Sequence, residues 1–499
     1  MTPLPTKILQ LARAGNPVRA WGVFGELGLR AVTNDIKVLT LKGRLLKDLA
    51  WRAADEERAR LFREATDAYL AAHALKADSY PLINAAALAL FAGEEDRTNE
   101  LARQVLELID NNTDEGETPF WREATRAEAH LLLGEQAKAE AALAEGVAKL
   151  PQAWEDHART LEQFAAITEV QGGDPAWLDR FRPPPSLHFS GLIGLDPDAP
   201  GLREEIDAAI ANLKPGFAFG ALAAGADIMI AEAAVALGAR LVVTLPNPIE
   251  DFRARSIEPY RADWGKRFDA LIERAERVEH VPPGTGEEDN PFALSIDTAS
   301  LVSMGQAIRN ADILSSHAHA LTIVAPGEAE RLHVGHWRMS GRPLHRIEST
   351  RAFGGGNPTV SSEGSALDIC LSAIVCFDGL SAADADVLAD RNDLTPQGIG
   401  ARTGFVGKPK ECLAAMESVV AEAGAITGAL SIDVFPDQQP GPMIVDRTDR
   451  LLQAAERGQF LTDYQSAMIA RVLAVDIHIE ELGELASLSG PISLWSINS

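Results

Sequence analysis

The sequence predicts a protein of class α + α/β, with an N-terminal α-solenoid, a central α/β domain built on a parallel sheet and a C-terminal α/β domain. Three observations predict this class. Residues from about 37 to 180 are rich in Ala, Leu, Glu and Arg and repeat with a fixed period. From residue 186 onward, apolar runs alternate with helical segments, which is typical of a parallel sheet. A glycine- and serine-rich stretch then precedes a second set of apolar runs.

These changes in pattern set the expected domain boundaries. The polyproline run that begins at Pro183 ends the helical region and is a stiff linker. We therefore expect a helical repeat domain at 1–182, a ligand-binding domain at 186–350, a linker at 351–366 and a last domain at 367–499. Within the central domain, strands are expected at 187–194, 217–223, 240–246, 320–326 and 342–349, and helices at 201–213, 225–238, 257–276 and 297–312.

The helical region carries columns of similar residues spaced 37 positions apart. Small residues in one column let antiparallel helices approach closely, while a bulky column fills the groove between units. The columns are Ala65, Ala102 and Ala139, and, in the preceding helix of each unit, Leu46, Ile83 and Phe120. The pattern resembles a tetratricopeptide array, and this resemblance implies that the repeats bind a partner protein. A helical bundle without repeats is the alternative interpretation.

Composition excludes several classes of partner. The formal charge is −26, from 46 basic and 72 acidic residues. Nucleic acid and anionic membranes need Lys and Arg to neutralise their phosphates, so we expect neither as a partner. A small phosphorylated ligand stays open, because backbone amides hold phosphate with little side-chain charge. The N-terminus lacks an apolar signal region and no run approaches the length of a membrane span, which predicts a cytoplasmic location.

Cysteine and histidine patterns predict neither a disulfide framework nor a metal site. The three cysteines form no CxxC pair, so we expect them to serve packing. Four histidines cluster in the sequence, but no carboxylate or thiol accompanies them at a spacing typical of zinc. They are His317, His319, His333 and His336.

Two strand-to-loop transitions in the central domain carry the candidate ligand-binding residues. Ligands of open parallel sheets bind outside the carboxyl ends of the strands, so both loops are expected to contribute to one site. Amides at a glycine-rich helix start would hold a phosphate there. The candidates are Ser190, Gly191 and Gly194 in the first loop, and Gly220, Ala221, Gly225, Ala226 and Asp227 in the second. The alternative is that the glycines serve only strand–helix packing.

This segment resembles the SLOG superfamily, in particular the variant that follows helical repeats in bacterial signalling proteins. The resemblance rests on an ordered pattern of Gly220, Gly225, Ala226, Asp227, Glu232, Gly238 and Pro246. It implies a Rossmann-like sheet and a bound nucleotide such as ADP-ribose, AMP or a NAD derivative, with no further cofactor.

This sequence differs from the superfamily's LOG-type phosphoribohydrolases in one loop. Those enzymes carry a PGGxGTxxE loop, whose Glu acts on an N-glycosidic bond. Here residues 325–337 keep Pro326 and Gly327, but the second Gly and the Gly-Thr are absent. Gly327 is retained as a candidate ligand contact. Glu328 and Glu330 are candidates for the acid, with a role as solvated residues at a helix start as the alternative.

The C-terminal region resembles a class III nucleotide cyclase domain in residues 374–381, 441–464 and 487–497. That family uses two carboxylates to hold two metal ions, and an Asn and an Arg four residues apart on a helix. Here Arg450 is present, Asp446 stands in the Asn position, Asp378 is out of register by one, and no second carboxylate is found. We therefore expect a degenerate, catalytically inactive domain that pairs two subunits in a homodimer.

Three functions remain open at this point. The first is a regulatory protein that senses a nucleotide-derived ligand in the central domain and binds a protein through its repeats. The second is an enzyme of the phosphoribohydrolase type that cleaves a nucleotide at the central site. The third is a structural adaptor that binds no ligand. Fold analogy does not choose among them, because function depends on the site.

Overall fold

The computed structural model describes residues 4–13, 15–111, 118–260, 262–281, 291–327, 330–352, 369–399, 402–422, 426–436, 442–473, 477–485 and 491–498. The chain forms two compact units. The first comprises Met1–Pro183 with Ile313–Ser315, and the second comprises Pro184–Asp312 with Ser316–Ser499.

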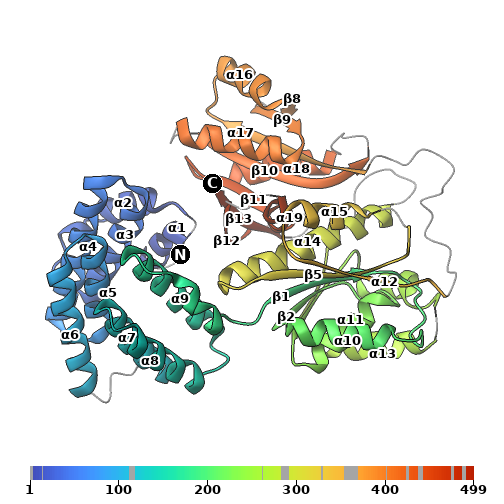
Figure 1. Ribbon diagram of the computed structural model, residues 1–499. Helices are drawn as coiled ribbons and strands as arrows, with labels where there is room; N and C mark the ends of the chain where they lie inside the picture. Colours follow the sequence, from blue (N-terminus) through green and yellow to red (C-terminus); the bar gives the residue numbers. More distant parts are fainter. Residues whose placement is uncertain are drawn as a thin grey trace. The chain divides into compact units, whose positions relative to one another are not determined.

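The regular elements described in the first unit are helices (Figure 1). They are α1 (Leu4–Arg13), α2 (Pro17–Glu26), α3 (Ile36–Arg52), α4 (Asp55–Leu75), α5 (Ser79–Phe91), α6 (Glu95–Asn111), α7 (Pro119–Leu132), α8 (Gln136–Lys149) and α9 (Trp154–Val170), with 3-10 turns at Leu29–Ala31 and Pro175–Phe181.

The period of 37 residues corresponds to successive helix pairs. Ala65, Ala102 and Ala139 lie at equivalent places on α4, α6 and α8, and all three are fully buried. The bulky column lies on α3, α5 and α7, where Leu46, Ile83 and Phe120 are also buried. The small residue on the second helix of each pair therefore packs into a shared core, as the sequence pattern predicts.

The second unit begins with a six-stranded sheet in which every strand pair is parallel. Its elements in chain order are β1 (Ser186–Gly191), α10 (Leu202–Leu213), β2 (Phe217–Gly220), α11 (Ala226–Ala236), β3 (Arg240–Leu245), α12 (Ile249–Ser256), α13 (Ala262–Arg274), β4 (Arg277–His280), α14 (Pro291–Ile313), β5 (Ala318–Val324), α15 (Leu332–Met339) and β6 (Leu344–Glu348).

The five strands expected in this sheet are present, and a further edge strand, β4, was not predicted. Its sequence, RVEH, is short and polar, so it carries none of the apolar alternation that identifies a strand. The helix predicted at about 257–276 is present as the shorter α13, and the preceding helix α12 was not predicted. The short helix α15 was also not predicted.

Helices cover the two faces of the parallel sheet unequally. Leu187 and Phe189 of β1 belong to the same core as α10, α11 and α13. The alternate residues of the strand point to the other face, where Ala318 and Ala320 of β5 share a core with α14 and α15. Figure 1 shows α10, α11 and α13 on one side of β1 and β2, with α14 and α15 on the other.

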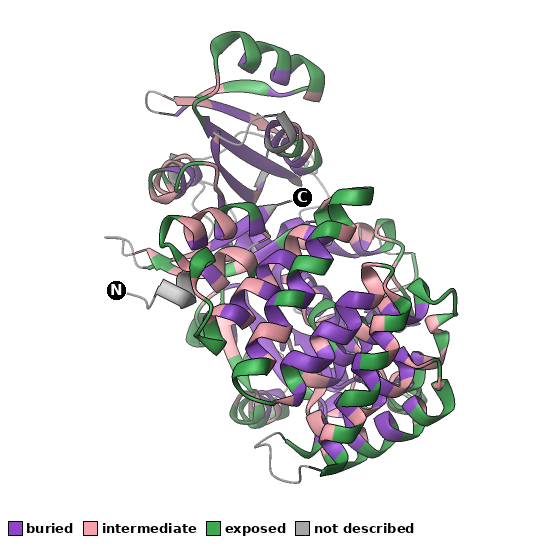
Figure 2. Ribbon diagram, turned by 90° about the vertical axis from the view of Figure 1, so that its left-hand side faces the viewer, coloured by how far each residue is buried: buried purple, intermediate pink, exposed green. Residues whose placement is uncertain are grey.

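A seven-stranded mixed sheet completes the second unit, in the order β12-β13-β11-β10-β7-β9-β8. Its elements are β7 (Ile369–Asp378), α16 (Ala382–Asn392), β8 (Thr395–Ile399), β9 (Arg402–Gly407), α17 (Pro409–Glu422), β10 (Thr427–Pro436), α18 (Pro442–Ala454), β11 (Phe460–Asp463), α19 (Tyr464–Leu473), β12 (His478–Leu485) and β13 (Ile492–Asn498). Figure 2 shows its central strands buried and α16 largely exposed.

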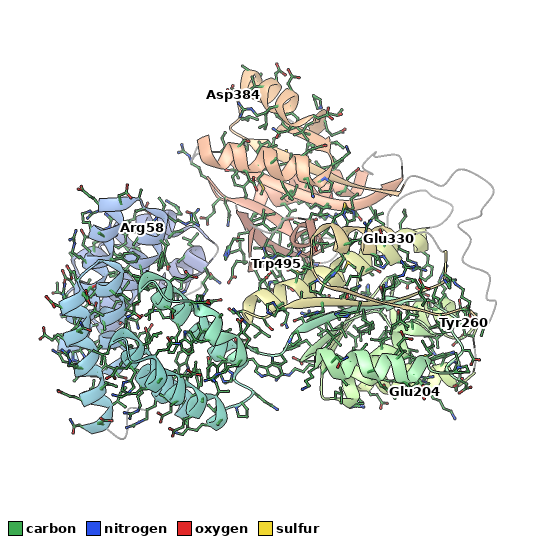
Figure 3. The ribbon with its side chains drawn as sticks, viewed as in Figure 1. Arg58, Glu204, Tyr260, Glu330, Asp384 and Trp495 are labelled. Carbon is green, nitrogen blue, oxygen red and sulfur yellow. The ribbon has the colours of Figure 1, made fainter. Side chains whose placement is uncertain are left out.

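The two sheets of this unit share one hydrophobic core. That core contains residues of α14, α15, β7, α17 and α19. Across the same interface, the Arg309 guanidinium of α14 lies 4.8 Å from the centre of the Trp495 ring of β13 (Figure 3). The C-terminal sheet is therefore packed onto the α14–α15 face of the parallel sheet.

Two further sequence expectations concern the described residues. Cys376 and Cys412 are buried and free of disulfides, in agreement with a packing role, whereas the side chain of Cys370 lies outside the described part. Within the part of the chain that the structure describes, no helix has the length and apolar character needed to cross a bilayer.

Candidate functional site

The order of the parallel sheet reverses between β1 and β5. From β1 the chain adds β2, β3 and β4 on one side, and then crosses to place β5 and β6 on the other. Loops leaving the carboxyl ends of β1 and β5 diverge at such a switch point and leave room for a ligand. A pocket with about 530 Å³ of empty space, part of it open to solvent, lies here.

Four segments line this pocket. Residues 190–192 end β1 and residues 322–324 end β5, while β6 contributes Leu344 and Arg346. The fourth segment is the start of α15, with Glu330, Arg331, His333 and Val334. The pocket is thus on the sheet face that α14 and α15 cover.

Two hydroxyl groups and a guanidinium lie in one register row across the pocket floor. Ser190 pairs with Thr322, and Thr322 pairs with Arg346, so their side chains project from the same face. The Ser190 hydroxyl donates to Thr322 Oγ1 at 3.4 Å. The row provides hydrogen-bonding groups beside a positive charge.

The charged groups of the pocket are predominantly basic. Arg346 is exposed and lies 3.4 Å from the Glu348 carboxylate. Arg331 is exposed and forms no side-chain hydrogen bond or ion pair with the described residues. Glu330 is engaged by Arg338, with its Oε2 2.8 Å from Nη2 (Figure 3). In a chain with a charge of −26, the pocket is therefore lined by two arginines and one paired glutamate.

His333 is the most buried polar side chain among the lining residues. It is 1% exposed, and its Nδ1 lies 3.4 Å from Asp297 Oδ1 of α14. Its Nε2 is buried without a hydrogen-bond partner in the described structure. His188 of β1 lies beside it, with ring centres 6.4 Å apart. Burial, and secondarily the neighbouring His333 ring, lower the pKa of His188 well below its usual value.

Asp227 lies behind the pocket at the start of α11. Its Oδ2 accepts a hydrogen bond from the Ala223 amide at 3.2 Å, and its Oδ1 is buried without a hydrogen-bond partner among the described residues. Burial raises the pKa of Asp227 to about 7, against the opposing effects of the Ala223 amide, the Arg331 charge and the Gly191 amide. A carboxyl predicted to contact ligand therefore accepts a hydrogen bond from the turn that precedes its own helix.

The structure brings together only two of the predicted ligand-binding residues in this pocket, Ser190 and Gly191. In the turn before α11, Leu222 and Ala224 belong to the core on the other face of the sheet. Gly194, Gly220, Ala221, Gly225, Ala226, Asp227 and Gly327 are not among the lining residues. A ligand contact by any of these seven residues stays a prediction.

Three of the predicted glycines have a close packing contact. A Cβ on Gly191 would lie 2.6 Å from Ala226 Cβ, and one on Gly220 would lie 2.6 Å from the Phe189 ring. Gly225 adopts φ +132°, and a Cβ there would lie 2.5 Å from the Leu192 carbonyl oxygen. The loop after β1 therefore closes over the start of α11, and a valine at 225 would disrupt the fold whether or not a ligand binds.

The two candidate acids are placed differently. Glu328 lies outside the described residues. Glu330 lines the pocket, but its ion pair with Arg338 occupies the carboxylate. Glu232, which belongs to the SLOG-like pattern, accepts two hydrogen bonds from Arg267 of α13 at 2.8 and 2.6 Å and so connects neighbouring helices.

The pocket residues missed by the sequence analysis are Thr322, Arg331, His333 and Arg346. Thr322 and Arg346 lie within strands, and nothing local to them indicates that they share a row with Ser190. His333 was considered only as a metal ligand. The segment RLHVGHW directly after a predicted strand was the available signal, because its basic residues follow a carboxyl end.

The cyclase-like positions do not form a metal site in the described structure. Asp378 is exposed at the end of β7, and the next hairpin, residues 395–407, contains no carboxylate in its sequence. Asp446 pairs with Arg450 one turn along α18, with Oδ2 2.8 Å from Nε. No group of three or more potential metal ligands occurs among the described His, Cys, Asp and Glu residues.

A buried ionic cluster in the C-terminal sheet was not predicted. Arg447 of α18 lies between two carboxylates, with Nη2 3.4 Å from Asp433 Oδ2 and Nε 3.3 Å from Asp463 Oδ2. Asp463 also accepts a hydrogen bond from the Ser466 hydroxyl at 2.7 Å. A single internal arginine therefore lies between two carboxylates.

Comparison with known proteins gives one family match and a structural neighbour. No curated protein matches the chain. Among solved structures, it is similar to the crystal structure of the catalytic core of a rhodopsin-guanylyl cyclase with converted specificity in complex with ATPalphaS, at 10% identity and a TM-score of 0.20, over 26% of this chain and 96% of that chain. Residues 5–89 match the family model Tetratricopeptide Repeats-Sensor, which indicates a sensing or signalling role.

Proposed function

We propose that the protein is a regulatory sensor whose parallel-sheet domain binds a nucleotide-derived ligand in the pocket between β1 and β5. The observation that carries the proposal is the position of this basic, hydroxyl-lined pocket at the switch point of the sheet. In this proposal the repeats bind a partner protein, and the C-terminal domain is a catalytically inactive, cyclase-like domain that pairs subunits.

The lining residues suit the parts of a nucleotide. Arg331 and Arg346 supply charge for a phosphate, and the first free amides of α15 point the positive end of a helix toward the same pocket. The Ser190 and Thr322 hydroxyls can bond to ribose or phosphate oxygens. Leu192, Ile323 and Val334 supply apolar surface for a base. The proposal requires no metal and no further cofactor.

Ligand binding is tested by titrating ADP-ribose, AMP, NAD⁺ and cyclic nucleotides in calorimetry and thermal unfolding. A ligand at a hundred times its dissociation constant is expected to stabilise the fold by about 2.7 kcal/mol. Arg346→Gln should weaken binding of the same compound by about tenfold or more, because it removes a charged hydrogen bond.

Arg274→Gln is the matched control for this experiment. Arg274 is exposed at the end of α13, which covers the other face of the sheet, and it is not a lining residue. The control should bind ligand about as well as the wild type. Absence of binding by every compound, or equal binding by both arginine variants, would favour the structural adaptor.

An N-glycosidic hydrolase is the second candidate, because the Glu330 carboxylate lines the pocket. Its test is release of free base from AMP, followed by chromatography. Activity that Glu330→Gln abolishes would establish the hydrolase. Binding without turnover would leave the sensor as the better description.

A further inference from the structure

We infer that the ligand of the β1–β5 pocket binds through a phosphoryl group together with a proton, which His333 takes up. This inference rests on the proposed ligand site and adds a recognition residue and a pH-linked regulation to it. It follows from the unpartnered Nε2 of a side chain that is 1% exposed and lines the pocket.

The tautomer of His333 is determined by its neighbour on α14. Asp297 Oδ1 lies 3.4 Å from Nδ1, and a carboxylate accepts but does not donate. The neutral ring therefore carries its hydrogen on Nδ1 and leaves a lone pair on Nε2. A phosphoryl oxygen is also an acceptor, so it cannot hydrogen-bond to Nε2 in this state. Only the doubly protonated ring donates to Asp297 and to an anion at once.

The charges around His333 make its protonation depend on the ligand. Asp297 is the anionic group that faces it from α14, and Glu330, which precedes it, is occupied by Arg338. Arg331 at α15 and Arg346 on β6 would repel a further positive charge in an empty pocket. The other titratable groups near it are His188 on β1 and His336 on α15, and burial lowers the pKa of both rings. A bound phosphoryl anion offsets that repulsion, so ligand and proton binding favour each other.

The ligand class is therefore a phosphate monoester or diester group, and its two sources are a nucleotide and free phosphate. The experiment uses AMP, inorganic phosphate and adenosine as probes in titration calorimetry of the full chain. Each titration is run at pH 7.5 in two buffers of different ionisation enthalpy, so that the difference in heat gives the number of protons taken up. Adenosine has the same base and ribose but no anion.

The expected result is net uptake of a fraction of a proton, up to one, with AMP. The affinity for AMP should fall by as much as tenfold per pH unit between about pH 7 and 8.5. In this range the phosphate monoester, with a second pKa of about 6, is already a dianion, so its own titration does not contribute. Proton uptake with inorganic phosphate as well would identify the phosphoryl group as sufficient. Uptake with AMP alone would identify the nucleotide as the source. Either result supports the inference.

Two variants test the role of His333 itself. His333→Gln keeps a neutral donor in place of the ring, so AMP should bind with no proton uptake and with an affinity that does not change with pH. Asp297→Asn removes the carboxylate that stabilises the protonated ring, so the pH dependence should shift to lower pH while binding persists. Thermal unfolding checks that both variants are folded. If His333→Gln does not fold, the shift in pH dependence of Asp297→Asn still tests the role of His333.

The outcomes separate this inference from the proposed function. AMP binding to the wild type without proton uptake, or with uptake unchanged in both variants, overturns the role of His333 and leaves the ligand site standing. Failure of both AMP and phosphate to bind the wild type between pH 6 and 8.5 overturns phosphoryl recognition at this site. Adenosine binding with equal proton uptake also overturns it, because no anion is then involved.

Discussion

Gly305 of α14 lies against the main chain of Met468 in α19, so closely that a Cβ on residue 305 would overlap the Met468 carbonyl. The contact is part of a polar and apolar interface along α14. Gln306 donates to the Tyr464 hydroxyl at 2.6 Å, and Arg471 Nε donates to Asp312 Oδ2 at 2.7 Å. One helix therefore covers the parallel sheet and also packs against the C-terminal domain.

Gly305→Ala is expected to destabilise the second unit by about 1–3 kcal/mol, because the methyl group forces α14 and α19 apart. Chemical denaturation measures the loss. Gly22→Ala in α2 is the control, since a Cβ at residue 22 meets no atom within 4 Å and alanine favours a helix. A Gly305→Ala variant as stable as the Gly22→Ala variant would contradict the close approach.

Asp227→Asn should remove a pH dependence of stability. The folded-state pKa of about 7 lies above the value of about 3.9 for an unfolded chain. The stability that the protonated carboxyl contributes is therefore fully present below about pH 4 and is lost as the pH rises through 7. Between the two pKa values, the free energy of unfolding falls by about 1.4 kcal/mol for each pH unit.

The asparagine variant stays neutral, so its unfolding free energy should change less between pH 5 and 8 than that of the wild type. Denaturation at several pH values measures this difference. Glu204→Gln, at an exposed position on α10, retains Asp227 and should follow the wild-type curve. Parallel curves for Asp227→Asn and the wild type would be evidence against a buried, protonated Asp227.

Ala102→Leu tests the helical repeat. Ala102 is fully buried on α6, so three additional carbon atoms overpack the contact between helices and should cost about 1–3 kcal/mol. Ala141→Leu on α8 is the control, because residue 141 is exposed. Thermal unfolding gives both values, and an unchanged midpoint for Ala102→Leu would count against the 37-residue register.

Arg447→Met should destabilise the C-terminal sheet by up to about 3–5 kcal/mol, because it leaves Asp433 and Asp463 without their shared cation. Burial already raises the pKa of Asp433 while Arg447 opposes the shift. Lys408→Met removes an exposed ion pair with Glu411 and should cost less than about 1 kcal/mol. Equal losses in the two variants would show that the cluster is not an electrostatic unit.

No cyclic nucleotide should form from ATP or GTP with Mg²⁺ or Mn²⁺. Asp378 has no second carboxylate on the neighbouring hairpin, and Asp446 places a negative charge beside Arg450. Mass spectrometry of the reaction mixture measures the product. Turnover that disappears in Arg450→Ala would reverse the assignment of an inactive domain.

Local patterns were sufficient for much of the fold. The alanine columns at 65, 102 and 139 predicted helix pairs. Residues that are buried at equivalent places in successive units recur at a fixed spacing, and this spacing is visible in the sequence. The apolar runs of β1, β2, β3, β5 and β6 were predicted for the same reason. The strand β4 and the helix α15 were missed, since the first is polar and the second has only eight residues.

The sequence by itself determined most element types and the net charge of −26, and it predicted a ligand site at the carboxyl edge near Ser190 and Gly191. Only the tertiary structure decided which face of the sheet holds the pocket. Strand order and register place Thr322 and Arg346, more than 130 residues along the chain, in one row with Ser190. The glycine-rich turn before α11 lies against the loop after β1 instead. The physical reason is that strand pairing and the pleat set which side chains meet, and neither is encoded in the spacing of residues within one segment.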